Sequence, residues 1–63
     1  MNNKITILKE RVTDKGDIKV CLYEGKEEYY FLTLNNKVLV YSRYIGRVLR
    51  RYRKVTVKAL VTN

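Results

Sequence analysis

The first 41 residues follow the two-residue period of β-strands, with apolar and β-branched residues at alternate positions. In the first such segment Ile5 and Ile7 flank Thr6, and the later segments are rich in valine, leucine and tyrosine. The pattern predicts four strands, at residues 3–12, 18–24, 29–34 and 37–41. The chain contains no proline, which suits a continuous sheet.

Short polar segments separate these strands and carry residues that favour turns. In the first, residues 13–17, Asp14 can bond its own backbone and Gly16 can supply a positive φ. The second surrounds Gly25 at residues 24–27. The third is the pair Asn35-Asn36, and because asparagine tolerates positive φ we predict a type I′ hairpin there. Connections this short predict mainly antiparallel pairing.

The lengths of the last two loops predict a register for the sheet. A two-residue loop at residues 25–26 places Val20 opposite Phe31, and one at residues 35–36 places Phe31 opposite Val40. The predicted core face then carries Ile18, Val20, Leu22, Tyr29, Phe31, Thr33, Val38 and Val40. The predicted second face carries Lys19, Cys21, Tyr23, Tyr30, Leu32, Leu34, Leu39 and Tyr41. This second face is too apolar to meet water alone, so we expect a helix, the terminal strands or a second copy of the chain to cover it, and a slip of one residue would exchange the two sets.

Between Ser42 and Lys54 the period changes to that of a helix, and the residues sort onto two faces. The apolar stripe, at i, i+3, i+4 and i+7, consists of Ile45, Val48, Leu49 and Tyr52. The basic stripe, at i, i+4, i+7 and i+11, consists of Arg43, Arg47, Arg50 and Lys54. Ser42 is the expected N-cap.

Alternation returns at residues 55–61, where three valines and Ala59 point the same way, and predicts a final strand. The predicted fold is therefore α+β: a small, mostly antiparallel sheet in the order β-β-β-β-α-β, with one basic amphipathic helix near the C-terminus. We expect residues 1–63 to form a single small domain. Gly46 disfavours the helix by about 1 kcal/mol relative to alanine. In the alternative, residues 48–61 form one long strand of an all-β small barrel.

The net charge of +8 resides entirely in the second part of the chain. Residues 1–28 hold six acids and six bases, whereas residues 29–63 hold eight bases and no acid. Such asymmetry indicates a polyanionic partner. Five of the six bases between residues 42 and 54 are arginine, whose planar guanidinium binds two phosphate oxygens at once.

These observations predict a small basic nucleic-acid-binding protein, with DNA favoured over RNA, that contacts phosphates through its arginine-rich helix. Among the tyrosines, which mostly suit packing in a sheet, Tyr44 lies off the apolar stripe between two arginines and is expected to touch the ligand. The predicted nucleic-acid-binding residues are Arg43, Tyr44, Arg47, Arg50, Arg51, Arg53 and Lys54.

Clustered carboxylates carry the same charge as phosphates, so an alternative is a small virus- or plasmid-type protein that inhibits or modulates an acidic protein partner. A third interpretation is a purely structural oligomer. Membrane-surface binding is disfavoured because the apolar stripe contains no Trp or Phe. Because a chain of 63 residues can bury only a small core, we also expect a homodimer.

Catalytic and metal-binding functions have little support. The chain has no histidine, and its single cysteine, Cys21, lies in a predicted strand without an adjacent general base, so we expect an inert packed thiol. We expect no leader segment, because only four apolar-leaning residues, 5–8, follow the polar start of the sequence. No apolar run reaches the roughly 18 residues needed to span a bilayer. We therefore expect a cytoplasmic, non-enzymatic protein without a metal or cofactor.

Overall fold

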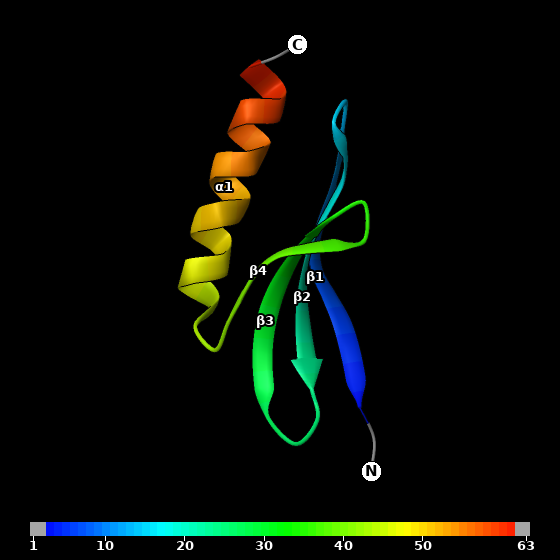
Figure 1. Ribbon diagram of the computed structural model, residues 1–63, viewed down its shortest axis with the longest axis vertical. Coiled ribbons are helices and arrows are strands. Elements are labelled where there is room, and N and C mark those ends of the chain that lie inside the picture. Colours follow the sequence, from blue (N-terminus) through cyan, green and yellow to red (C-terminus); the bar gives the residue numbers. More distant parts are fainter. Residues whose placement is uncertain (1–2, 62–63) are drawn as a thin grey trace.

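The computed structural model describes the backbone of residues 3–61 and the side chains of residues 3–57. Four strands form one antiparallel sheet in sequential order: β1 (Lys4–Thr13), β2 (Gly16–Glu24), β3 (Glu28–Leu34) and β4 (Lys37–Ser42). Helix α1 (Ile45–Val61) follows and lies along one side of the twisted sheet (Figure 1). The sheet is open, so the predicted α+β class is confirmed and the alternative barrel is not formed.

The final strand predicted at residues 55–61 is wrong, because α1 continues through these residues. Val55 and Thr56 follow Tyr52 by three and four positions and extend its apolar stripe, so packing against the sheet outweighs local β-propensity. The buried hydroxyl of Thr56 donates to the carbonyl oxygens of Tyr52 at 2.9 Å and Arg53 at 3.0 Å. This threonine therefore satisfies its polar group inside the helix.

The N-cap prediction also needs correction, since α1 begins at Ile45 and not directly after Ser42. The carbonyl of Tyr44 accepts the N–H of Arg47 at 3.1 Å, which places Tyr44 at the cap. The Ser42 hydroxyl instead accepts the N–H of Tyr44 at 3.1 Å. Ser42 therefore stabilises the tight connection that leads from β4 into the helix.

Strands β2 and β3 pair one residue away from the predicted register, with Val20 opposite Leu32. The turn between these strands contains three residues, 25–27, where a two-residue loop was predicted. The slip exchanges the two faces of β3. Leu32 consequently joins Ile18 and Val20 under α1, and Phe31 lies on the opposite face of the sheet.

Each edge strand contains a register shift that adds one unpaired residue, Leu8 in β1 and Leu39 in β4. In β4 the shift places Tyr41, and not Val40 as predicted, opposite Phe31. Val40 instead pairs with Leu32 and packs against the core. The two register changes together bring Phe31 and Tyr41 to the face that α1 does not cover.

The predicted positive-φ turn between β3 and β4 is confirmed, with φ of 52° at Asn35 and 68° at Asn36. The Asn35 side chain also reaches the β1–β2 turn, where its Oδ1 accepts the N–H of Asp17 at 3.0 Å. The Asn35 N–H donates to the Asp17 carbonyl at 2.9 Å. These hydrogen bonds tie together the two turns at this end of the sheet.

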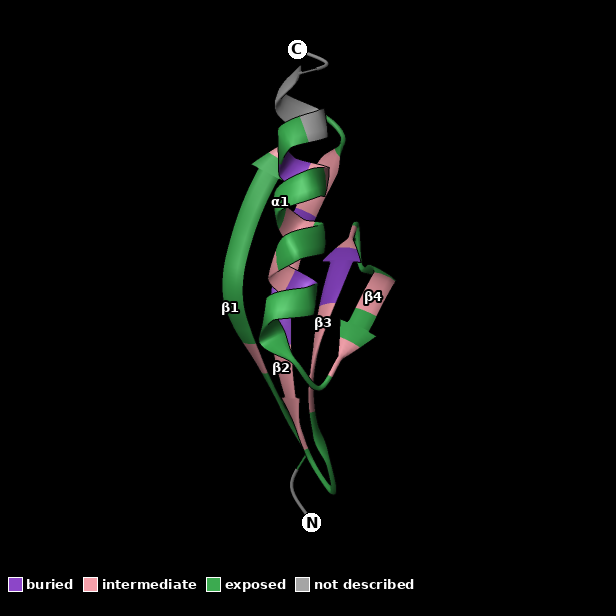
Figure 2. Ribbon diagram, turned by 90° about the vertical axis from the view of Figure 1, so that its left-hand side faces the viewer, coloured by how far each residue is buried: buried purple, intermediate pink, exposed green. Residues whose placement is uncertain are grey.

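The core lies between α1 and the sheet face beneath it (Figure 2). Its fully buried side chains are Ile18, Val20, Leu32 and Val48. Partly buried residues pack around them from the sheet and the helix: Tyr30, Leu34, Leu39, Val40, Leu49, Tyr52 and Val55. The predicted apolar stripe therefore anchors the helix through three of its members, while Ile45 at the first turn is exposed.

Replacing Gly46 by alanine is expected to raise the free energy of unfolding by about 0.5–1 kcal/mol. Gly46 lies in the first turn of α1, and an added Cβ meets no atom within 4 Å. Chemical denaturation followed by circular dichroism measures the change. Gly16→Ala is the matched control and is expected to destabilise, because Gly16 has φ of 137° and its added Cβ would collide with the Asn35 side chain. Equal effects at both glycines would contradict this account of α1.

Candidate nucleic-acid interface

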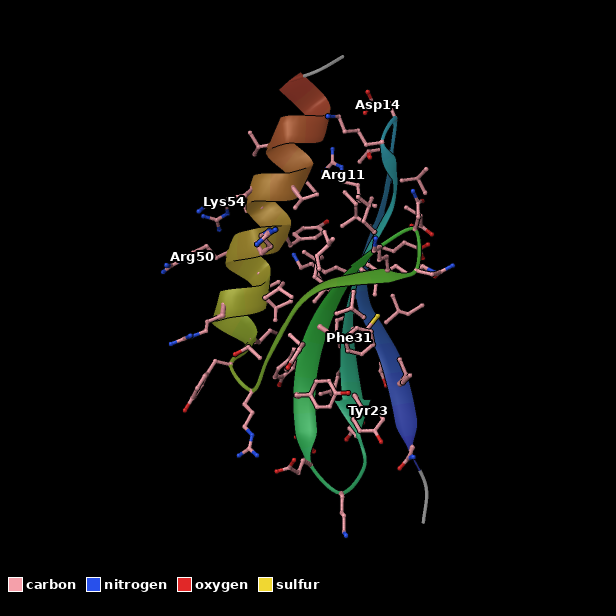
Figure 3. All side chains as sticks on the ribbon, in the orientation of Figure 1. Arg11, Asp14, Tyr23, Phe31, Arg50 and Lys54 are labelled. Carbon is pink, nitrogen blue, oxygen red and sulfur yellow. The ribbon has the colours of Figure 1, made fainter. Side chains whose placement is uncertain are left out.

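The side of α1 that faces away from the sheet carries exposed cations. Figure 3 shows Arg50 and Lys54 pointing outward from the helix, away from the strands. The exposed cations of the helix within residues 45–57 are Arg47, Arg50, Arg51, Arg53 and Lys54, which we call the basic helix surface. This surface contains five of the seven predicted nucleic-acid-binding residues.

Helical spacing arranges these cations as a central stripe with two flanks. Arg47, Arg50 and Lys54 follow one another at i, i+3 and i+7, and so line up along one side of the helix. At 1.5 Å per residue, Arg47 and Lys54 are separated by about 10 Å along the axis. Arg51 and Arg53 lie on either side of this stripe. The outward half of α1 therefore presents guanidinium groups over a broad arc.

No carboxylate neutralises this surface within the described part of the chain. The sequence from residue 45 onward contains no acid, and α1 has none in its first turn. Among residues 3–57, the ion pairs within 4 Å are Asp17–Lys19 and Glu27–Arg43, and neither involves the helix. Like charges this close together create a positive potential that attracts polyanions.

Arg43, predicted as the first member of the basic stripe, lies outside the helix. It belongs to the connection between β4 and α1, and its guanidinium forms an ion pair with Glu27 in the β2–β3 turn. Both side chains are exposed, so the pair adds little to stability. The pairing does, however, direct Arg43 away from the cations of α1 and offset its charge.

Tyr44 borders the basic helix surface at its N-terminal end. The Arg47 guanidinium carbon lies 5.9 Å from the centroid of the Tyr44 ring, within the range of a cation–π contact. The tyrosine ring is largely exposed. Tyr44 therefore holds a position in which it orients Arg47 and can itself touch a bound ligand.

Two bases of β1 extend the positive charge, although the sequence pattern did not single them out. Lys9 pairs opposite Val20 and Arg11 opposite Ile18, so both lie on the sheet face that carries α1. The Lys9 ammonium lies 5.8 Å from the centroid of the Tyr52 ring, midway along the helix on the side that packs on the sheet. The unpaired Leu8 sets this orientation, and only knowledge of that register shift could have identified these residues.

Cys21 does not form a reactive site. The thiol is 4% exposed, and burial raises its pKa, while the charge of Lys19 partly opposes the shift. The thiol is therefore protonated near neutral pH and poorly nucleophilic. Within the described residues, cysteine and the acidic side chains form no cluster suited to a metal ion. No helix in residues 3–61 has the length and apolar character needed to cross a membrane.

Comparison of the chain with protein-family models, with curated proteins and with solved structures found no match.

Proposed function

We propose that the protein binds double-stranded nucleic acid, DNA in preference to RNA, through the basic helix surface. One observation carries the proposal: five exposed cations, four of them arginine, lie on one helix without a carboxylate partner among the described residues. Arginine pairs with phosphate oxygens in a bidentate geometry, and cations that neutralise phosphates release counterions from the duplex.

The separation of cations from aromatic rings favours a duplex over a single strand. Proteins that bind single strands stack bases on aromatic side chains beside the cations that hold the backbone. Here Tyr29, Phe31 and Tyr41 lie on the sheet face opposite α1, remote from the basic helix surface. In the described part of the chain, the exposed Tyr44 borders the basic helix surface. The cation beside the aromatic rings of the other face is Arg43, and Glu27 offsets its charge.

The shape of the surface favours DNA over RNA. An α-helix with its side chains is about 10–12 Å wide, and the major groove of B-DNA, about 12 Å wide, admits one. The deep, narrow major groove of an RNA duplex does not. Figure 2 shows α1 in front of the sheet, with exposed residues on the side turned away from the strands. This exposed side is the one that would enter a DNA groove.

The proposal is tested by fluorescence anisotropy, in which the protein is titrated into a labelled DNA duplex at several salt concentrations. Four to six phosphate contacts predict that log K falls against log[salt] with a slope of roughly −4 to −5. Duplex RNA and single-stranded DNA are expected to bind more weakly. Absence of binding at low salt, or a slope near zero, would reject the proposal. Polyglutamate that competes as well as DNA would instead support an acidic protein partner.

A further inference from the structure

We infer that the sheet face opposite α1 is the interface of a homodimer, formed when this face packs against the same face of a second copy. The face is rich in apolar and aromatic side chains that α1 does not cover. Six of them define what we call the open-face patch: Ile5, Ile7, Tyr29, Phe31, Val38 and Tyr41. Four of these side chains are more than half exposed: Ile5 at 60%, Ile7 at 51%, Val38 at 53% and Tyr41 at 71%. A monomeric protein rarely leaves such a cluster in water.

The patch is continuous, because its members are neighbours in the strand pairing. One row of paired residues crosses all four strands and consists of Ile7, Cys21, Phe31 and Tyr41. The Tyr29 ring lies 6.2 Å from the Phe31 ring and 6.0 Å from the Tyr41 ring, between centroids. The three aromatic side chains help to line a hollow of about 870 Å³, together with Ile5 and Val38. Contiguous aromatic groups of this kind are typical of the centre of a protein–protein interface.

Charge distribution on the molecule favours a second copy as the occupant. At the rim of the hollow Glu27 pairs with Arg43, and further along the same face Asp17 lies 3.5 Å from Lys19. Glu10 also lies on this face, opposite Lys19, so the face holds carboxylates beside its cations. The basic helix surface, which has no carboxylate partner among the described residues, lies on the other side. Two copies can join through this face while their basic helix surfaces stay apart. This face therefore lacks the excess of one charge that would attract a strongly charged partner.

The chain exposes more surface than a compact monomer of the same mass. A compact monomer of 7.5 kDa exposes about 4,250 Å². This chain exposes 4932 Å². The excess of about 700 Å² follows from the elongated shape, with principal extents of 43 × 18 × 15 Å, in which α1 covers one face of the sheet only.

The edges of the sheet are poorer surfaces for self-association than its face. The edge strand β1 is interrupted at Leu8 and carries Lys4, Lys9 and Arg11, and charges and bulges of this kind oppose strand pairing. The other edge strand, β4, has six residues and its own register shift. Face-to-face packing avoids both edges and yields two sheets about 10 Å apart, with the helices outside. A two-fold axis through the patch sets each copy's patch against its equivalent.

Light scattering after size exclusion tests the inference on a dilution series of the protein without nucleic acid. The expected mass is twice the 7.5 kDa of the chain. The double variant Ile5→Glu/Tyr41→Glu is expected to show the mass of one chain. Its new carboxylates would face the same carboxylates of the second copy and repel them. The matched control is Val57→Glu/Tyr44→Glu, which changes an aliphatic and an aromatic residue exposed by 51% and 69% on other surfaces. This control is expected to remain dimeric.

Circular dichroism establishes that each variant is folded. If Ile5→Glu/Tyr41→Glu does not fold, the single variant Val38→Glu replaces it, since Val38 is exposed near the β3–β4 turn. A wild-type mass of one chain throughout the series overturns the inference. Dissociation of the Val57/Tyr44 control, with the open-face variants intact, overturns it as well and places contact on the helix side. Because no nucleic acid is present, the outcome is independent of the proposed function.

Discussion

The double variant Arg47→Glu/Arg50→Glu is expected to bind duplex DNA at least about 100-fold more weakly than the wild type at 0.1 M salt. Each phosphate contact contributes about 0.9 to the salt slope, which at this salt concentration corresponds to nearly tenfold in affinity. Loss of two contacts therefore removes almost 100-fold, and the new carboxylates add repulsion. The slope of log K against log[salt] is expected to become shallower by about 2. Anisotropy titrations at several salt concentrations measure both quantities.

The matched control is Lys15→Glu/Lys26→Glu, which has the same net charge as the helix variant but alters the β1–β2 and β2–β3 turns. At 0.1 M salt the Debye length is about 10 Å, so charges outside the interface contribute weakly. A loss of less than about tenfold is expected for this control. Equal losses in the two variants would mean that total charge, and not α1, determines binding. The four residues substituted in the two variants are all exposed, so both variants should retain the fold.

Local patterns in the sequence predict the four strands well. Alternation locates the four strands, and the paired asparagines at 35 and 36 predict the positive-φ turn that the chain adopts. The register of β2 and β3 is not predicted, because it depends on whether the turn after Glu24 contains two residues or three. A single extra residue moved Phe31 from the predicted core to the open face.

The end of the helix could not be predicted from local propensity. Residues 55–57, Val-Thr-Val, favour a strand in isolation, and their alternation suggested one. In the folded chain Val55 packs on the core, and the Thr56 hydroxyl bonds to carbonyls of the preceding turn. A tertiary contact with the sheet thus decides the conformation of the segment, and such a contact cannot be inferred from neighbours in sequence.

The sequence likewise predicts only the part of the candidate interface that depends on local structure. Helical periodicity alone brings Arg47, Arg50 and Lys54 to one side of α1. Arg43 was assigned to the same stripe because the helix was expected to begin earlier, and it instead meets Glu27. The contribution of Lys9 depends on the unpaired residue in β1, which the alternation of residues 3–12 does not reveal.

The proposed homodimer and the basic helix surface together predict that the protein bridges two DNA duplexes. With the open faces in contact, the α1 helices lie on the two outer sides of the dimer, and their basic surfaces point in opposite directions. Layers about 10 Å apart place the two helix axes about 30 Å from each other. A straight duplex can therefore contact one helix only. The second helix remains free to bind another duplex.

Bridging is measured by capture of a labelled duplex on beads that carry an unlabelled duplex. Wild-type protein is expected to retain the label at moderate protein concentration and to release it in large excess, when each dimer binds DNA on one side only. Ile5→Glu/Tyr41→Glu is expected to bind a single duplex with nearly unchanged affinity, because both changes lie on the face opposite α1. Its capture should fall to the level of beads without protein. Arg47→Glu/Arg50→Glu should lose both binding and capture. Capture that survives disruption of the open face would show that DNA is gathered by charge neutralisation and not by a two-sided dimer.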